Sequence, residues 1–243
     1  MKRIGAYILG LFVLLTISGC WPSAQEYCDM GNKLLSENNA ADAMERFEAA
    51  LRADSAYTPA WEGKGKCLEA MNKWMDARNF YNDFIERDKM NAHPYLRLGL
   101  VYQRLRDKES ECEVYVRAYT LGVKNYDVLA MVPMCVRDTY DEKMRLLEEA
   151  IAMDPSRYEA KAARLELMMK YNSVDIIYPE ALKLLKEHSK SPKVYYLMSK
   201  VHRGIPYSGA DSVCYYLQKC INMKYYEASD DYYLYGCRQF EKK

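Results

Sequence analysis

The residue types that usually carry out enzymatic chemistry are sparse in this sequence and form no recognisable constellation. The three histidines, His93, His188 and His202, lie far apart, and none has a second metal-binding side chain at ligand spacing. The chain contains neither the G-x-S-x-G motif of serine hydrolases nor the H-E-x-x-H motif of zinc proteases. We therefore predict no enzymatic activity of its own, no metal site and no cofactor.

The run Gly63-Lys64-Gly65-Lys66 resembles a fragment of a phosphate-binding loop. Such loops connect a strand to a helix and bind phosphate through backbone N–H groups. Here the run lies inside a predicted helix, and no strand precedes it. We therefore predict no nucleotide site at this position.

Eight cysteines offer thiol chemistry, and no two of them form a C-x-x-C pair. Cys20 belongs to the N-terminal segment described below. We expect the other cysteines to be small buried side chains, which is common for cysteine. The alternative is a disulfide between neighbouring helices, Cys220 with Cys237 for example, in an oxidising compartment. The seven cysteines concerned are Cys28, Cys67, Cys112, Cys135, Cys214, Cys220 and Cys237.

Positive side chains recur on one face of a predicted helix. His93, Arg97 and Arg104 are spaced i, i+4 and i+11, which returns each to nearly the same face. Apolar Tyr95 and Leu98 lie on the opposite face, so the positive stripe is not core. Two interpretations remain: a solvated face, or a surface where Arg97 and Arg104 hold carboxylates of an acidic or C-terminal peptide segment.

The chain is also rich in tyrosine, with 23 residues and adjacent pairs at Tyr195-Tyr196, Tyr215-Tyr216, Tyr225-Tyr226 and Tyr232-Tyr233. Tyrosine is enriched at protein interfaces. It also serves as a large packing residue, and we assign at least one tyrosine of each pair to packing.

The elements that position these side chains repeat every 34 residues across residues 24–125. Each copy places a large aromatic residue four positions before a glycine on its first helix. The first two copies also place a small residue on their second helix. A glycine inside a helix costs about 1 kcal/mol relative to alanine, so three in phase indicate close helix packing. The positions are Tyr27, Trp61 and Tyr95, then Gly31, Gly65 and Gly99, then Ala43, Ala77 and, in the third copy, Glu111.

This period and residue order resemble the tetratricopeptide repeat (TPR) family. The resemblance implies an all-α, right-handed superhelix (solenoid) of about six antiparallel helix pairs. Residues 24–125 would form three regular repeats, residues 126–227 degenerate repeats, and residues 228–243 a capping helix and tail. We expect Pro133 to kink or shorten its helix, and the helix near Pro179 to begin at about that residue.

In TPR proteins the inner face of each repeat's first helix lines a concave groove that takes a peptide. By this resemblance the groove here would present Asn32, Lys66, His93, Arg97 and Arg104. Chaperone-binding members hold a C-terminal carboxylate with a Lys/Asn/Asn/Lys/Arg set. Only Asn32 and Arg97 match that set, so the clamp is incomplete.

The N-terminus carries the marks of a secretory signal: Lys2 and Arg3, then a short apolar run from Ile4 to Ile17. The following Ser18-Gly19-Cys20 resembles a bacterial lipoprotein signal, which implies removal of residues 1–19 and lipidation of Cys20. Residues 20–23 would then be a short linker to the membrane. An uncleaved anchor is the alternative, although the run is shorter than the roughly 20 residues that span a bilayer.

These features together predict a non-enzymatic scaffold in the bacterial envelope that binds a peptide or partner protein. Trp21 follows the lipidated cysteine where an inner-membrane retention signal has Asp, which favours the outer membrane, facing the periplasm. A formal net charge of +1 gives no case for nucleic acid. The alternative is a glycan- or nutrient-binding lipoprotein with embedded TPR helices. The sequence names neither the partner nor the oligomeric state.

Overall fold

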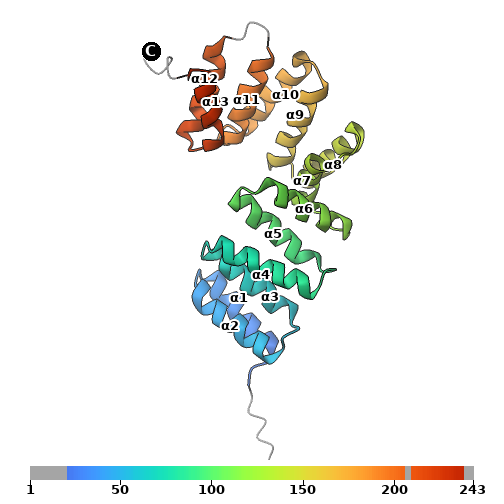
Figure 1. The fold of residues 1–243 in the computed structure, drawn as a ribbon, viewed down its shortest axis with the longest axis vertical. Helices are drawn as coiled ribbons and strands as arrows, with labels where there is room; N and C mark the ends of the chain where they lie inside the picture. Colours follow the sequence, from blue (N-terminus) through green and yellow to red (C-terminus); the bar gives the residue numbers. More distant parts are fainter. Residues whose placement is uncertain (1–20, 206–208, 238–243) are drawn as a thin grey trace, which may run out of the picture. The chain divides into compact units, whose positions relative to one another are not determined.

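The computed structural model describes residues 21–205 and 209–237 (Figure 1). The predicted signal peptide and the predicted lipidation site Cys20 lie outside the described residues, as does the end of the predicted tail. Within the described ranges all regular secondary structure is helical, which confirms the predicted all-α fold class.

The helices follow one another as six pairs and a short cap. The first helices of the pairs are α1 (Ala24–Ser36), α3 (Thr58–Ala70), α5 (Ala92–Leu105), α7 (Tyr126–Cys135), α9 (Glu159–Tyr171) and α11 (Pro192–Gly204). The second helices are α2 (Ala40–Ala53), α4 (Trp74–Arg87), α6 (Lys108–Thr120), α8 (Tyr140–Met153), α10 (Val174–Glu187) and α12 (Ala210–Asn222). The cap consists of the 3₁₀ turn η1 (Tyr226–Ala228) and α13 (Ser229–Leu234).

The 34-residue period is visible directly in the helix boundaries. The helices α1, α3, α5 and α7 begin at Ala24, Thr58, Ala92 and Tyr126, each 34 residues after the last. The turns within the first three pairs repeat at the same interval, because Asn38, Asn72 and Arg106 all adopt φ values near +60° (61°, 57° and 60°). Asparagine tolerates this left-handed conformation better than most residues, whereas arginine gains nothing from it.

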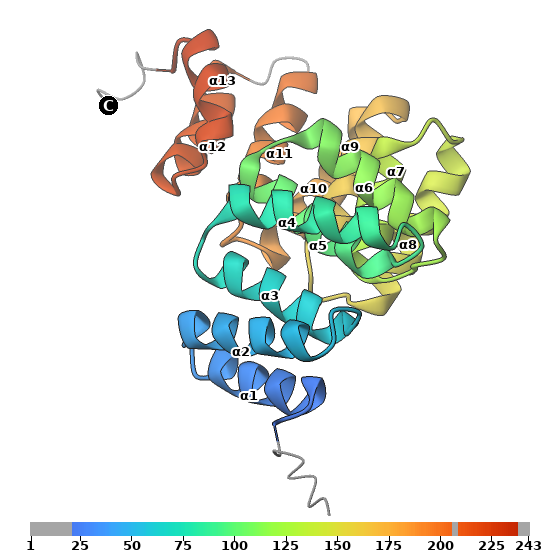
Figure 2. The ribbon, with the colours of Figure 1, turned by 60° about the horizontal axis from the view of Figure 1, so that its bottom comes forward.

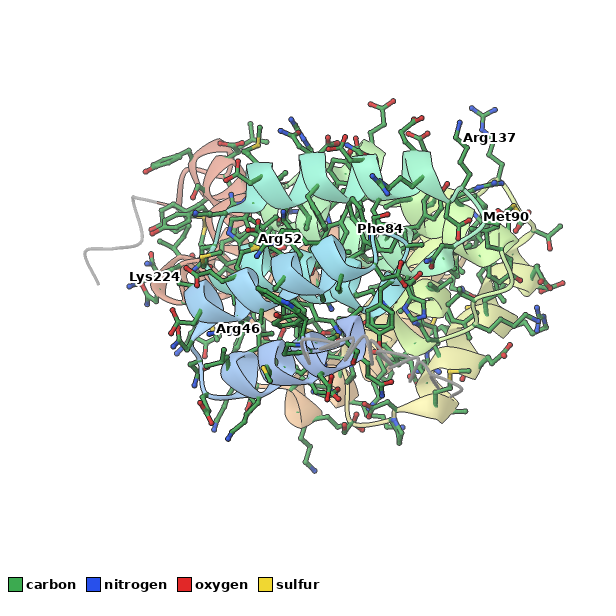
Figure 3. All side chains as sticks on the ribbon, turned by 90° about the horizontal axis from the view of Figure 1, so that it is seen from below. Arg46, Arg52, Phe84, Met90, Arg137 and Lys224 are labelled. Atoms are coloured by element: carbon green, nitrogen blue, oxygen red, sulfur yellow. A yellow bond between two sulfur atoms is a disulfide. The ribbon has the colours of Figure 1, made fainter. Side chains whose placement is uncertain are left out.

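The helices divide into two compact units, the first ending at Lys73 and the second beginning at Trp74. In the first unit Phe47 of α2 is completely buried between α1 and α3. A Cβ atom added at Gly31 would lie 2.9 Å from the Phe47 ring, and one added at Gly63 would lie 2.2 Å from it. Gly63 is therefore a packing residue. Arg46 and Arg52 of α2, labelled in Figure 3, are exposed.

In the second unit each helix from α4 to α13 packs against the next one along the chain, as a solenoid-like succession (Figures 1 and 2). Within this unit, α9 also contacts the first helices on either side, α7 and α11. Three predicted repeat positions of this unit, Tyr95, Gly99 and Ala77, are buried. Gly99 admits the ring of Tyr115, which a Cβ atom there would meet at 2.6 Å.

The remaining predicted repeat positions are also inside or near the core. Ala43, Gly31 and Gly65 are buried. Trp61 is half-buried, and its Nε1 donates a hydrogen bond to the backbone oxygen of Ser55 at 3.0 Å. These positions are compatible with the predicted register of the first three repeats.

Glu111 departs from the pattern, because it occupies the position that Ala43 and Ala77 fill in the preceding repeats. Its side chain is fully buried in α6, and Oε2 lies 2.9 Å from Nζ of Lys108. Its other carboxylate oxygen has no hydrogen-bond partner among the described residues.

The two helix-internal prolines have different effects. Pro133 lies within α7, which has only 10 residues, so the predicted shortening is confirmed. The predicted helix start near Pro179 is wrong, because α10 begins five residues earlier at Val174. Pro179 is the sixth residue of α10, and it removes only one backbone hydrogen bond there. Burial of Ile177 in this first part of the helix offsets that loss.

Two disulfides correct the expectation that all seven cysteines are thiols. Cys112 pairs with Cys135 and Cys214 pairs with Cys237, both across 23 residues of sequence. Cys214 follows Cys112 by 102 residues, which is three periods of 34, so the bridges occupy equivalent places in the repeat. The suggested Cys220–Cys237 pairing is wrong, since Cys220 instead points toward α11 and bonds to the backbone oxygen of Pro192.

Candidate partner-binding surface

The predicted groove residues of the first unit lie near one another. Asn32 is exposed on α1, and its Nδ2 is 3.7 Å from Sγ of the buried Cys28. The pKa of the Cys28 thiol is raised, first by burial and then by the charge of Asp29, while Lys66 acts in the opposite direction. Asn32 and Lys66 are thus close to one buried thiol, at the contact between α1 and α3.

The predicted groove residues of the second unit already take part in interactions within the protein. His93 and Arg97 both have interaction partners in the chain. The guanidinium of Arg104 lies 5.7 Å from the centroid of the Trp74 ring, at the start of α4. The positive stripe of α5 is therefore partly occupied by neighbouring side chains, and this surface offers less free charge than the sequence indicates.

A denser set of polar and aromatic side chains lies on α11, and we call it the α11 stripe. Lys193, Tyr196, Lys200 and Arg203 are spaced i, i+3, i+7 and i+10, which places them along one helix face. All four are half-buried. Their partners come from α9 on one side and from the cap helix α13 on the other, so three elements build this surface.

Two carboxylates of the protein already bind at the ends of the α11 stripe. Glu166 of α9 has Oε1 2.7 Å from Nζ of Lys193. Asp231 of α13 accepts a hydrogen bond from the Tyr196 hydroxyl at 2.7 Å, and the same oxygen lies 2.7 Å from Nη2 of Arg203. Burial opposes ionisation of Asp231, but the contacts with Arg203 and Tyr196 outweigh it and hold the pKa of this carboxyl below its ordinary value.

Lys200 lies between these two ion pairs. Its Nζ is 4.4 Å from the centroid of the Tyr196 ring, within the range of a cation–π interaction. Among the residues that the structure describes, Lys200 makes neither an ion pair nor a hydrogen bond through Nζ. Burial lowers the pKa of its ammonium; Glu166 and Asp231 raise it, and Lys193 and Arg203 lower it further.

Aromatic rings border the stripe. The Tyr225 ring lies 5.7 Å from that of Tyr196, and the guanidinium of Arg203 lies 4.3 Å from the centroid of Tyr235. Tyrosine rings beside cations suit a surface that binds a partly apolar, partly charged segment.

Sequence reasoning missed the α11 stripe because it assigned at least one tyrosine of each pair to packing and placed the binding groove on the first three repeats. The signal was present: two lysines, one tyrosine and one arginine recur at helical spacing within a predicted helix. The carboxylates that complete the surface could not be found this way. Glu166 and Asp231 come from other helices, and their proximity depends on the tertiary structure.

Other kinds of site have little support in the described part of the chain. The described residues contain no cluster of His, Cys, Asp or Glu that could hold a metal. None of the described helices has the length and apolar character needed to cross a bilayer. A cavity of about 130 Å³ beside α9 and α10 is smaller than typical small-molecule sites, and Arg164 in its lining already binds Glu180 at 2.9 Å. A hollow of about 520 Å³ at the turn from α10 to α11 has the volume of a ligand site, but its lining from Glu187 to Pro192 is mostly one polar turn and lacks the largely apolar walls of such sites.

Comparison with known proteins supports the repeat assignment. No protein-family model matches the chain. A probable UDP-N-acetylglucosamine–peptide N-acetylglucosaminyltransferase SPINDLY from Hordeum vulgare is 28% identical over 97 residues, and its counterpart from Arabidopsis thaliana is 32% identical over 87 residues. These matches cover 40% and 36% of this chain, but only 10% of each plant enzyme. The chain thus spans about a tenth of the length of these relatives.

Solved structures match over more of the chain. The TPR protein YrrB, described as having an unusual peptide-binding site, aligns with a TM-score of 0.53 and 16% identity, covering 73% of this chain and 91% of YrrB. A TPR protein from Parabacteroides merdae aligns with a TM-score of 0.53 and 13% identity, covering 87% of this chain and 98% of that one.

The APC/C hetero-tetramer Cut9–Hcn1 gives a TM-score of 0.60 at 16% identity, covering 88% of this chain and 43% of that chain. At these identities the likeness shows the fold alone, and that fold is of the TPR type.

Proposed function

We propose that this protein is a non-enzymatic, membrane-anchored scaffold of the bacterial envelope that binds a peptide or partner protein. The observation that carries this proposal is the α11 stripe, where charged and aromatic side chains from three helices meet on one surface. In a TPR-type fold such a surface on the first helices is a suitable place for an extended peptide.

The envelope location rests on the sequence and on the cysteines. The signal-like segment that ends at Cys20 supports export and lipid anchoring. The disulfides Cys112–Cys135 and Cys214–Cys237 support an oxidising compartment, because such bonds rarely persist in a reducing cytosol. A protein anchored in the outer membrane, with its helical domain in the periplasm, would account for both the signal-like segment and the disulfides.

The similarity to the plant transferases supports the repeat and not the reaction. The matched segments make up only 10% of each enzyme. We therefore propose a role in binding, with no transferase activity.

Glycan binding by a lipoprotein is the second candidate function, and exposed tyrosines favour it. Tyr215, Tyr226 and Tyr233 on α12, η1 and α13 are 55%, 60% and 57% exposed. Flat aromatic faces of this kind can stack on sugar rings. The two candidates differ in what copurifies with the protein.

Both parts of the proposal can be tested in cells that make the protein. We expect the wild-type chain to fractionate with membranes without residues 1–19, and Cys20→Ser to be released. After mild crosslinking and purification, a stoichiometric protein partner supports the scaffold, and a bound glycan supports the second candidate. A Cys20→Ser variant that stays in the membrane with residues 1–19 attached would contradict the lipid anchor.

A further inference from the structure

We propose that Lys200 of the α11 stripe binds a carboxylate of the partner, supplied by an acidic side chain or by the C-terminus of an extended peptide segment. This inference rests on the proposed function and gives the chemistry of its ligand. It is carried by the charges, the geometry and the dimensions of the stripe.

The charges leave one cation for a ligand. Lys193 and Arg203 are each paired with a carboxylate of the protein at 2.7 Å. Lys200 lies between them with no anionic partner within ion-pair distance among the described residues. A half-buried ammonium without a counter-ion has lost part of its hydration. A carboxylate of the partner would compensate for that loss with a charge-assisted hydrogen bond.

The geometry of the stripe already suits carboxylates. Asp231 is held by a tyrosine hydroxyl and an arginine, and Glu166 by a lysine. These two internal carboxylates bind the same stripe that we assign to the partner. The ring of Tyr196, 4.4 Å from Nζ of Lys200, adds an apolar face beside the cation. An incoming acidic group would meet the Lys200 ammonium, while Asp231 keeps its own contacts with the Tyr196 hydroxyl and with Arg203.

The dimensions of the stripe fit an extended segment. Lys193 and Arg203 are ten residues apart on one helix, which corresponds to about 15 Å along its axis. An extended chain rises about 3.3 Å per residue, so four or five residues would cover this distance. The carboxylate would lie near the middle of that contact, with neighbouring residues against Tyr196 and Tyr235.

The test uses the purified full-length protein and three pools of synthetic heptapeptides. All peptides have an acetylated N-terminus and random residues other than Asp and Glu around a fixed central position. The first pool has central Glu and a C-terminal amide, and the second has central Gln and a free C-terminus. The third pool has central Gln and a C-terminal amide, so it carries no carboxylate. Retention on immobilised protein is compared among the pools.

We expect the first pool, the second pool or both to be retained about tenfold better than the third. This ratio corresponds to a difference of about 1.4 kcal/mol in binding free energy. Preference for the first pool identifies an acidic side chain, and preference for the second identifies a C-terminus. Lys200→Gln should abolish the preference, Lys200→Arg should keep part of it, and the exposed control Lys190→Gln should leave it unchanged. The melting temperature of each variant verifies folding.

Equal retention of all three pools, unaffected by Lys200→Gln, would overturn the inference at Lys200 and leave peptide binding intact. Loss of the preference in Lys190→Gln as well as in Lys200→Gln would also overturn it, because net charge alone would then explain the result. Retention of no pool by the wild-type protein would contradict peptide binding itself, and with it this inference.

Discussion

Burial controls the chemistry of the three cysteines that remain thiols among residues 21–205 and 209–237. Cys28, Cys67 and Cys220 are each at most 2% exposed. Burial raises the pKa of Cys67 and of Cys220 to about 12, so almost no reactive thiolate exists at neutral pH. These residues act as small apolar side chains, as the sequence indicates.

Thiol titration of the purified mature protein tests this description. We expect no rapid reaction of the native protein with a thiol reagent, and three reactive thiols per chain after unfolding without reductant. Four thiols after unfolding would show that Cys20 is not lipidated. Five or more would contradict at least one disulfide.

Lys200 is expected to contribute to binding at some expense of stability. Because burial disfavours its charge, Lys200→Met should leave the melting temperature at pH 7 unchanged or raise it by about 1–2 °C. The exposed Lys190→Met serves as the matched control. A fall of several degrees for Lys200→Met alone would make Lys200 a structural residue.

The difference in melting temperature between the wild type and Lys200→Met should depend on pH with a defined sign. The pKa of Lys200 is lowered in the folded state, so near pH 10 the unfolded chain binds more protons at this group than the folded one. The wild type should therefore gain stability relative to Lys200→Met as the pH rises through the folded pKa. The melting temperatures of both proteins are measured from pH 7 to pH 10. A melting temperature of the wild type that falls relative to that of Lys200→Met over this range would contradict the lowered pKa.

Sequence reasoning at the residue scale succeeded where a position repeats and failed where chemistry depends on a distant neighbour. Gly31, Gly65 and Gly99 recur every 34 residues, and all three are buried. Gly63 has no counterpart at that period, and its contact with Phe47 is visible only in the folded unit. The disulfide partners likewise lie 23 residues apart, in different segments of the fold.

At the scale of elements, glycine sets how closely α2 and α3 approach each other. A Cβ atom at Gly63 would lie 2.2–2.5 Å from three atoms of the buried Phe47 ring. We expect Gly63→Ala to destabilise the protein by about 1–3 kcal/mol through overpacking. Gly204→Ala at the end of α11 should be close to neutral, because an added Cβ atom there would meet nothing within 4 Å beyond its chain neighbours and the backbone of its own helix. Denaturant unfolding compares the two variants, and equal midpoints would show that α2 and α3 are not in this register.

The cap helix α13 has only six residues, and the Cys214–Cys237 bridge links the chain just after it to α12. Loss of a bridge that closes a loop of this size costs about 3 kcal/mol in the chain-entropy model. We expect the double variant Cys214→Ser/Cys237→Ser to lose amide hydrogen-exchange protection in α13. Cys220→Ala retains the bridge and should retain the protection. Unchanged protection in the double variant would mean that packing alone holds the cap.

Element boundaries follow the period where the repeats are regular and deviate from expectation where they are not. The starts of α1, α3 and α5 could be predicted because aromatic, glycine and alanine recur in phase. The start of α10 could not, since Pro179 suggests a first turn and burial of Ile177 extends the helix beyond it. The α11 stripe lies in a predicted helix, but its significance depends on Glu166 and Asp231.

At the scale of the whole molecule, three features belong together: a TPR-type fold, a proposed lipid anchor and a proposed binding surface near the C-terminal cap. The fold follows from the 34-residue period and is supported by solved structures that cover up to 88% of this chain. The anchor is a proposal that rests on sequence alone. The proposed binding surface lies in the second unit, whose helices α9, α11 and α13 supply the α11 stripe and its two carboxylate partners.

The most direct test of the central proposal is site-specific photocrosslinking in cells that make the protein. A photoreactive phenylalanine derivative replaces Tyr235, which borders the α11 stripe, or in a control Leu182, which is 40% exposed on α10. We predict that illumination yields one discrete protein adduct from position 235 in the membrane fraction, and none from position 182. Adducts from position 182 alone, or none from position 235 while the protein is abundant in membranes, would contradict a partner-binding scaffold that uses this surface.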